Sequence, residues 1–103
     1  MEKVIRDGKV AVLYSSGFGS GWYSGNKDYP RCLYDPNIVA MVEAGQHDEI
    51  EAYCKTKYGE HFCARGAKGL EISWVPIGTR FVIDGYDGFE SIRACEDYEW
   101  LIA

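Results

Sequence analysis

Two turn sequences in the second half of the chain set strand registers that agree with each other, and this agreement most constrains the fold. The first turn is Pro76-Ile77-Gly78-Thr79, and the second is Asp87-Gly88. A slip of one residue would move every side chain to the other face, so the two registers together predict a three-stranded antiparallel meander. The predicted pairs are Trp74 with Phe81, Ile72 with Ile83, Phe81 with Ala94, Ile83 with Ile92, and Tyr86 with Phe89.

A second hairpin is predicted at the beginning of the chain. Asp7-Gly8 is a two-residue turn signal, and it would place Ile5 opposite Val10. The second arm of this hairpin, residues 9–14, is apolar on both faces. That pattern is typical of a strand that other elements cover on both sides.

Two helices are predicted between the hairpins. Asp35 suits the N-cap of the first helix, Pro36 its first position, and Gly45 the position after its end. The second helix is expected over residues 48–58, with Asp48 as its cap. Their apolar faces would consist of Ile38, Met41 and Val42 in the first helix, and Ile50, Tyr53, Cys54 and Tyr58 in the second.

These elements predict an α+β fold. We expect a single domain over residues 1–103, with an antiparallel sheet of about five strands and two helices on one face. The sheet would combine the N-terminal hairpin with the C-terminal three-stranded meander. An apolar fraction of 47% is typical of a globular protein. Residues 97–103 fit either an added strand or a helical turn.

The net charge of −5 argues against direct binding to nucleic acid, because the eleven Lys and Arg residues form no basic cluster. A charge of this size is ordinary for a soluble small domain; contact with a basic protein face is the alternative. No run approaches the ~18 apolar residues of a membrane span. The N-terminal residues also lack an apolar signal-peptide run. We therefore expect a cytoplasmic protein with free thiols.

The segment over residues 15–29, SSGFGSGWYSGNKDY, is rich in glycine and aromatic residues and is predicted to be a long loop. Long loops without a regular period are often functional. The segment is therefore a candidate binding loop; the alternative is that Trp22 and Phe18 close one edge of the core. The candidate binding residues are Phe18, Trp22, Tyr23, Tyr29 and Arg31.

Motifs for nucleotide binding and for a serine nucleophile are incomplete in this segment. The dinucleotide fingerprint needs a glycine where Trp22 or Ser24 stands, and no Gly-Lys-Ser/Thr follows. The nucleophile elbow needs glycines two residues either side of a serine, but Phe18 and Trp22 flank Ser20. A looser use of the loop amides to hold an anion stays open.

Cysteine, histidine and acidic residues supply the remaining candidates for chemistry. Cys54, His61, Cys63 and Cys95 lack the close ligand pairs of structural zinc sites, so free thiols are the simpler interpretation of Cys32 and these three cysteines. Cys63 with His61 or His47 is a candidate nucleophile–base pair. Acidic residues around the last turn are expected to be solvated, although paired carboxylates also serve in acid–base catalysis; these residues are Asp84, Asp87 and Glu90.

Three stretches resemble a pattern found in small phage- and prophage-encoded proteins of unassigned activity. One is GKVAVLYS (residues 8–15) with Gly17-Phe18-Gly19 and Gly21-Trp22, and another runs from Gly78-Thr79 through Phe81 and Ile83 to Tyr86-Asp87-Gly88. Leu33-Tyr34-Asp35-Pro36 is the third. The resemblance implies an accessory protein made inside a bacterial host cell. Such proteins often act by binding, for example by blocking a host defence complex or by sequestering a nucleotide signal.

Three functional hypotheses follow. The first is a non-enzymatic protein that binds a host protein, for instance as a counter-defence inhibitor, with the aromatic loop as its surface. The second is a nucleotide or small-molecule binder that stacks a base on Trp22 or Tyr23 and holds phosphate on the loop amides or Arg31. The third is a small enzyme that uses Cys63 or the acidic residues around the last turn. No cofactor or metal is expected, and each hypothesis is compatible with a homodimer.

Overall fold

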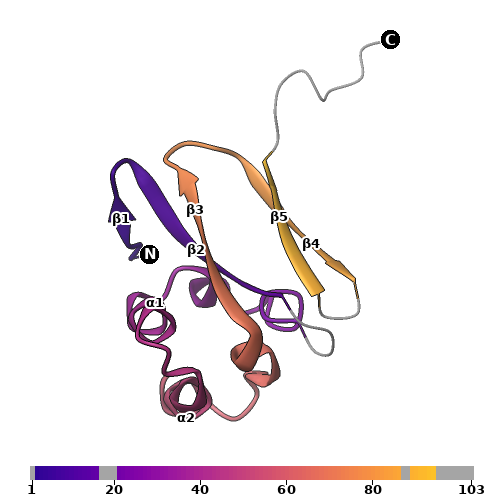
Figure 1. Cartoon of the computed structure of the whole chain (residues 1–103). Coiled ribbons are helices and arrows are strands. Elements are labelled where there is room, and N and C mark those ends of the chain that lie inside the picture. Colours follow the sequence, from indigo (N-terminus) through magenta and orange to yellow (C-terminus); the bar gives the residue numbers. More distant parts are fainter. Residues whose placement is uncertain (1, 17–20, 87–88, 95–103) are drawn as a thin grey trace.

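The computed structural model describes residues 2–16, 21–86 and 89–94, and confirms an α+β fold (Figure 1). A three-stranded sheet lies between two helices and a separate two-stranded hairpin. The elements are β1 (Ile5–Arg6), β2 (Lys9–Ser15), η1 (Pro30–Leu33), α1 (Pro36–Glu43), α2 (His47–Tyr58), η2 (Arg65–Gly69), β3 (Leu70–Pro76), β4 (Phe81–Tyr86) and β5 (Phe89–Ala94).

Strand β2 is the centre of the molecule, as its apolar pattern predicts. It pairs with β1 and β3, both antiparallel. Ile5 lies opposite Val10, which confirms the predicted first hairpin. Asp7 and Gly8 both have positive φ, as the two-residue turn requires. Successive β2 side chains are buried alternately against the helices and against the β4–β5 hairpin, so both faces of the strand are covered.

The predicted meander is correct for its last two strands and wrong for the first. Phe81 lies opposite Ala94 in the β4–β5 hairpin, with the expected register throughout, although the turn at Asp87-Gly88 lies outside the described residues. Strand β3, however, pairs with β2, and Trp74 lies opposite Ala11 rather than Phe81. Strand β2 has two edges, and the two-residue β1 pairs with only part of one of them, while the whole length of the other edge needs a hydrogen-bonding partner. Strand β3 supplies the missing full-length partner, so the five strands form two sheets.

Helix α1 forms as its capping residues predict. Asp35 accepts hydrogen bonds from the backbone at its N-terminus, Pro36 is its first residue, and Gly45 follows its end with positive φ. Helix α2 begins one residue earlier than predicted. Gln46 is its N-cap, so Asp48 lies in the first turn and is not the cap. Within the described residues, neither helix has the length and apolar character needed to cross a membrane.

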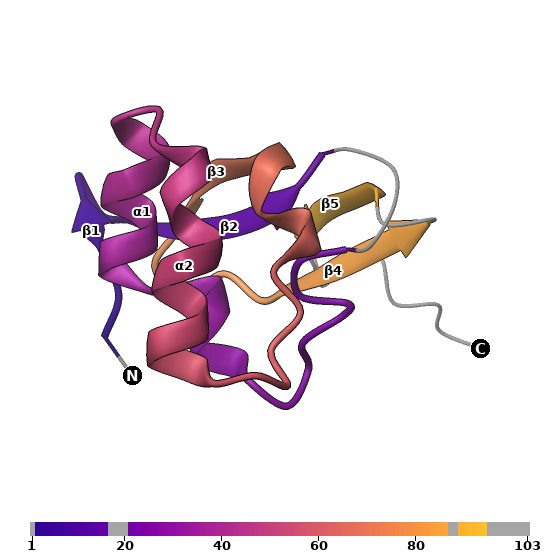
Figure 2. The ribbon, with the colours of Figure 1, turned by 90° about the horizontal axis from the view of Figure 1, so that it is seen from below.

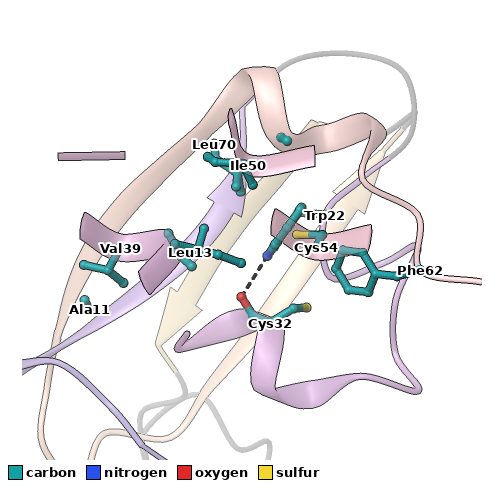
Figure 3. Close-up of a cluster of buried hydrophobic side chains, with 11 residues drawn as sticks. Ala11, Leu13, Trp22, Cys32, Val39, Ile50, Cys54, Phe62 and Leu70 are labelled. Atoms are coloured by element: carbon teal, nitrogen blue, oxygen red, sulfur yellow. Dashed lines mark hydrogen bonds between the residues drawn. The ribbon is translucent and has the colours of Figure 1, made fainter. Parts of the chain in front are cut away.

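Two hydrophobic cores lie on opposite sides of the central sheet. The larger core lies under the helices, which cover one face of β2 and β3 (Figures 2 and 3). The smaller core joins the opposite face of this sheet to the β4–β5 hairpin. The fully or nearly fully buried members of the larger core are Ala11, Leu13, Trp22, Cys32, Ile38, Val39, Ile50, Cys54, Phe62, Ala67 and Leu70. The smaller core contains Val12, Leu33 and Val75, with Phe81, Ile83 and Ile92 packed against them.

Candidate functional site

The structure buries Trp22, which was predicted to be a surface anchor. Its side chain has no exposed area, and its indole N–H donates to the Cys32 carbonyl oxygen at 2.9 Å (Figure 3). Its ring also meets the edge of Phe62, with centroids 5.2 Å apart. The alternative interpretation of Trp22 as a core residue is therefore correct. A large ring whose N–H has a buried carbonyl partner is more stable inside than in water.

The other candidate binding residues do not form one surface with Trp22. Tyr23 and Tyr29 are half-buried and pack against the core, and Tyr29 contacts Phe62 edge-on at 5.3 Å between centroids. Arg31 is exposed on η1 and lines a separate cavity. Phe18 lies outside the described residues.

The described part of the Gly-rich segment folds around the carboxylate of Glu90. Glu90 Oε1 accepts the backbone N–H of Ser15 at 3.0 Å, and Oε2 accepts the backbone N–H and the hydroxyl of Ser24 at 2.8 and 2.9 Å. The side chain is only 1% exposed. Two amides of this segment thus hold an anion, as the sequence left open, but the anion belongs to the protein itself.

Glu90 was expected to be a solvated turn residue, and that prediction is wrong. In the β4–β5 register it lies opposite Gly85, on the same face as Ile92, which packs into the smaller core. The alternation of side chains along β5 contains this information, because Glu90 and Ile92 are two positions apart. Only the close approach of the Gly-rich segment, which supplies the donors, makes burial of the carboxylate favourable.

Two features fix the Gly-rich segment in this position. A Cβ atom at Gly21 would lie 2.0 Å from Ser24 Oγ and 3.0 Å from Glu90 Oε2, so any side chain there would displace the Ser24 hydroxyl from the carboxylate. The buried side chain of Asn26 donates to the carbonyl oxygens of Trp22 and Cys63 and accepts from the Cys63 N–H at 2.8 Å. The segment is therefore attached to β5 on one side and to the chain after α2 on the other.

The predicted cysteine chemistry meets an unfavourable environment at two positions. Burial, followed by the nearby Glu90 carboxylate, raises the pKa of the Cys32 thiol to about 12. Burial also raises the pKa of Cys54 to about 12. Thiols are poor nucleophiles when they stay protonated, so neither is activated at neutral pH.

Of the two candidate nucleophile–base pairs, the structure keeps Cys63 beside His61 and places His47 elsewhere. Cys63 is half-buried, and it lines one cavity of about 360 Å³ with His61, whereas His47 hydrogen-bonds the Leu70 carbonyl oxygen at 3.0 Å. Among the described residues, no group of three or more His, Cys, Asp or Glu side chains is placed to hold a metal ion. Cys95 lies outside the described residues.

A second buried carboxylate, Asp35, organises the junction of α1 and α2. Besides capping α1, it accepts the hydroxyls of Tyr53 at 3.0 Å and Tyr58 at 2.6 Å. Burial, followed by this hydrogen bond to Asp35, raises the pKa of Tyr58 well above its ordinary range. A cavity of about 320 Å³ opens beside this group, with Arg31 and Lys57 among its lining residues. We call it the Asp35 cavity.

Sequence reasoning did not predict the Asp35 cavity, although part of the signal was present. The helical period places Tyr58 on the apolar face of α2. Lys57 is the neighbouring residue in the last turn, so it lies near the same end of the helix. The approach of Arg31 from η1 depends on tertiary structure alone. Comparison of the chain with protein-family models, with curated proteins and with solved structures finds no match.

Proposed function

We propose that this chain is a non-enzymatic binding protein that docks on another protein through the outer face of the β4–β5 hairpin. The observation that carries the proposal is the exposure of two large apolar side chains on that face. Val82 is 37% and Phe89 is 43% exposed. Their neighbours Ile83 and Glu90 point inward to the core and the Gly-rich segment, so the alternation of the strands fixes Val82 and Phe89 on the outside.

The position of the hairpin supports this surface. It packs against β2 on the side of the sheet opposite the helices (Figure 1). Among the described residues, β4 has hydrogen-bonded strand pairing with β5 only. Strand edges that lack further pairing offer backbone donors and acceptors to a strand of a partner, and exposed apolar side chains beside them add contact area.

Charge and resemblance suggest the chemistry of the partner. A net charge of −5 favours association with a protein surface that carries excess positive charge. The resemblance to small phage-encoded proteins points to a protein of the bacterial host, such as a component of a defence complex. The working surface in this proposal is the hairpin, because Trp22 is sealed in the core.

The experiment is affinity capture from a bacterial host lysate, with direct titration of the captured protein once it is purified. The double variant Val82→Ser/Phe89→Ser should lose the partner while keeping the circular dichroism spectrum of the wild type. Ile5→Ser, which changes a more exposed apolar residue on β1, is the control and should keep the partner. Capture that is unchanged in the double variant, or that fails for the wild type, contradicts the proposal.

A further inference from the structure

The Asp35 cavity lies apart from the hairpin surface, and its side chains suggest a ligand of different chemistry. We propose that this cavity binds a small organic phosphate monoester. Arg31 enters it from η1 and Lys57 from the last turn of α2. Both side chains are exposed, and neither forms an ion pair with another residue that the structure describes. Two cations from separate elements thus share one cavity with their charges unpaired.

Asp35 forms no ion pair with either cation among the described residues, although it lines the same cavity. Its Oδ1 accepts the N–H of Asn37 at 2.9 Å, and its Oδ2 accepts the Tyr58 hydroxyl at 2.6 Å. The side chain is 4% exposed and also accepts hydrogen bonds from Ile38 and Tyr53. Because neutral donors from the protein already occupy both oxygens, Asp35 needs neither cation as a hydrogen-bond donor, although its negative charge stays in the lining of the cavity. The cations remain available to a ligand.

The charge and geometry of the two cations favour phosphate over carboxylate. A phosphate monoester carries about −1.5 to −2 charges at pH 7, which matches one guanidinium and one ammonium group. Arginine binds phosphate oxygens with two parallel N–H donors, whereas lysine contributes a compact charge that adapts to the remaining oxygens. A carboxylate ligand would neutralise only one of the two.

The size of the cavity indicates that the ligand has an organic part. A volume of about 320 Å³ lies at the lower end of the ~300–1,000 Å³ range of small-molecule sites. One water in the liquid occupies about 30 Å³, so an inorganic anion would leave most of this space to solvent. Pro36 and Tyr58 are lining residues whose carbon atoms could contact an organic group. Glu2 also lines the cavity and opposes an anion by its like charge.

The test uses amide NMR titrations of the whole chain with AMP, glucose 6-phosphate and phosphoserine, each to millimolar concentration. At least one monoester should shift the resonances of Arg31, Asn37 and Lys57. Adenosine, glucose and serine, which lack the phosphate, should not. Inorganic phosphate should bind more weakly than the best monoester, because it leaves the apolar lining unused.

Variants distinguish specific binding in the Asp35 cavity from general electrostatic attraction of the ligand to the protein surface. Arg31→Ala and Lys57→Ala should each weaken the best monoester about tenfold, as expected for loss of one charge-assisted hydrogen bond. Lys55→Ala removes a lysine of the same helix that does not line this cavity, and should leave binding unchanged. Glu2→Gln should tighten binding. The proposal is overturned if no monoester binds, if inorganic phosphate binds as tightly, or if Lys55→Ala weakens binding as much as Lys57→Ala.

Discussion

Replacement of Glu90 by glutamine tests whether the Gly-rich segment is held by a carboxylate. Glutamine keeps the size of the side chain but turns one acceptor oxygen into an NH₂ donor. Among the described residues, the N–H and the hydroxyl of Ser24 converge on Oε2, whereas the Ser15 N–H reaches Oε1. The glutamine oxygen should therefore stay beside Ser24, and its NH₂ group would then face the Ser15 N–H, leaving that buried donor without an acceptor.

The expected loss of stability follows from these contacts. A buried donor without a partner costs about 1–3 kcal/mol, and the two remaining hydrogen bonds fall from ~1.5–3 to ~0.5–1.5 kcal/mol each when the charge is removed. Relief from burying a charge acts in the opposite direction and offsets part of this loss. We expect Glu90→Gln to lower the free energy of unfolding by about 2 kcal/mol, a large fraction of the ~5–15 kcal/mol of a typical domain.

Urea unfolding followed by tryptophan fluorescence measures this change, because Trp22 is buried beside the same segment. Urea is preferred to guanidinium, whose ions screen charges. Glu71→Gln is the matched control: it makes the same substitution at an exposed position of β3 and should change stability by less than about 0.5 kcal/mol. The reasoning is refuted if Glu90→Gln unfolds at the same urea concentration as the wild type, or if both variants lose the same stability.

Three further predictions concern buried groups. Trp22→Phe should cost about 2–4 kcal/mol, because it leaves a cavity and an unpaired Cys32 carbonyl; an unchanged melting temperature would show that the indole is not needed. At pH 8, iodoacetamide should label Cys32 and Cys54 only after unfolding, since both pKa values are about 12; peptide mapping that finds either one labelled in the native protein contradicts this. The same two pKa values exceed the ordinary thiol value of 9.0, so the folded state keeps protons that the unfolded state releases. The contribution of these two thiols to the free energy of unfolding should be complete below pH 9 and should be lost between pH 9 and 12. A urea midpoint that stays constant over that window would contradict this prediction.

Much of the fold follows from short sequence patterns. Asp35-Pro36 and Gly45 set the limits of α1, and Asp7-Gly8 sets the first hairpin, because caps and tight turns depend on a few adjacent residues. The choice of partner for β3 is different. A turn sequence after Trp74 favours pairing with the next strand, but it carries no information about the unpaired backbone of β2, far away in the sequence. Competition between two possible strand partners is decided by tertiary structure.

The candidate site was predictable to a smaller degree. The segment over residues 15–29 was correctly identified as unusual, but Gly21 serves a close approach to the internal carboxylate of Glu90. Glu90 lies two positions before Ile92, on the apolar face of β5. A charged residue on an apolar face was the feature of the sequence that could have predicted its buried role. A buried acid on such a face indicates that donors from another segment reach it. Arg31 was selected for its charge, whereas Lys57 and the Asp35 cavity come from the packing of η1 against α2.

The pairing of β2 with β3 has a consequence for synthesis of the protein. On the ribosome, β2 emerges early, yet the strand that completes its ladder begins only at Leu70. Until then the nascent chain exposes an apolar strand and the Trp22 segment, and the carboxylate that holds that segment arrives later still, with β5. Contacts this distant in sequence slow folding. We therefore expect the first half of the chain to depend on chaperone binding until Glu90 has left the exit tunnel.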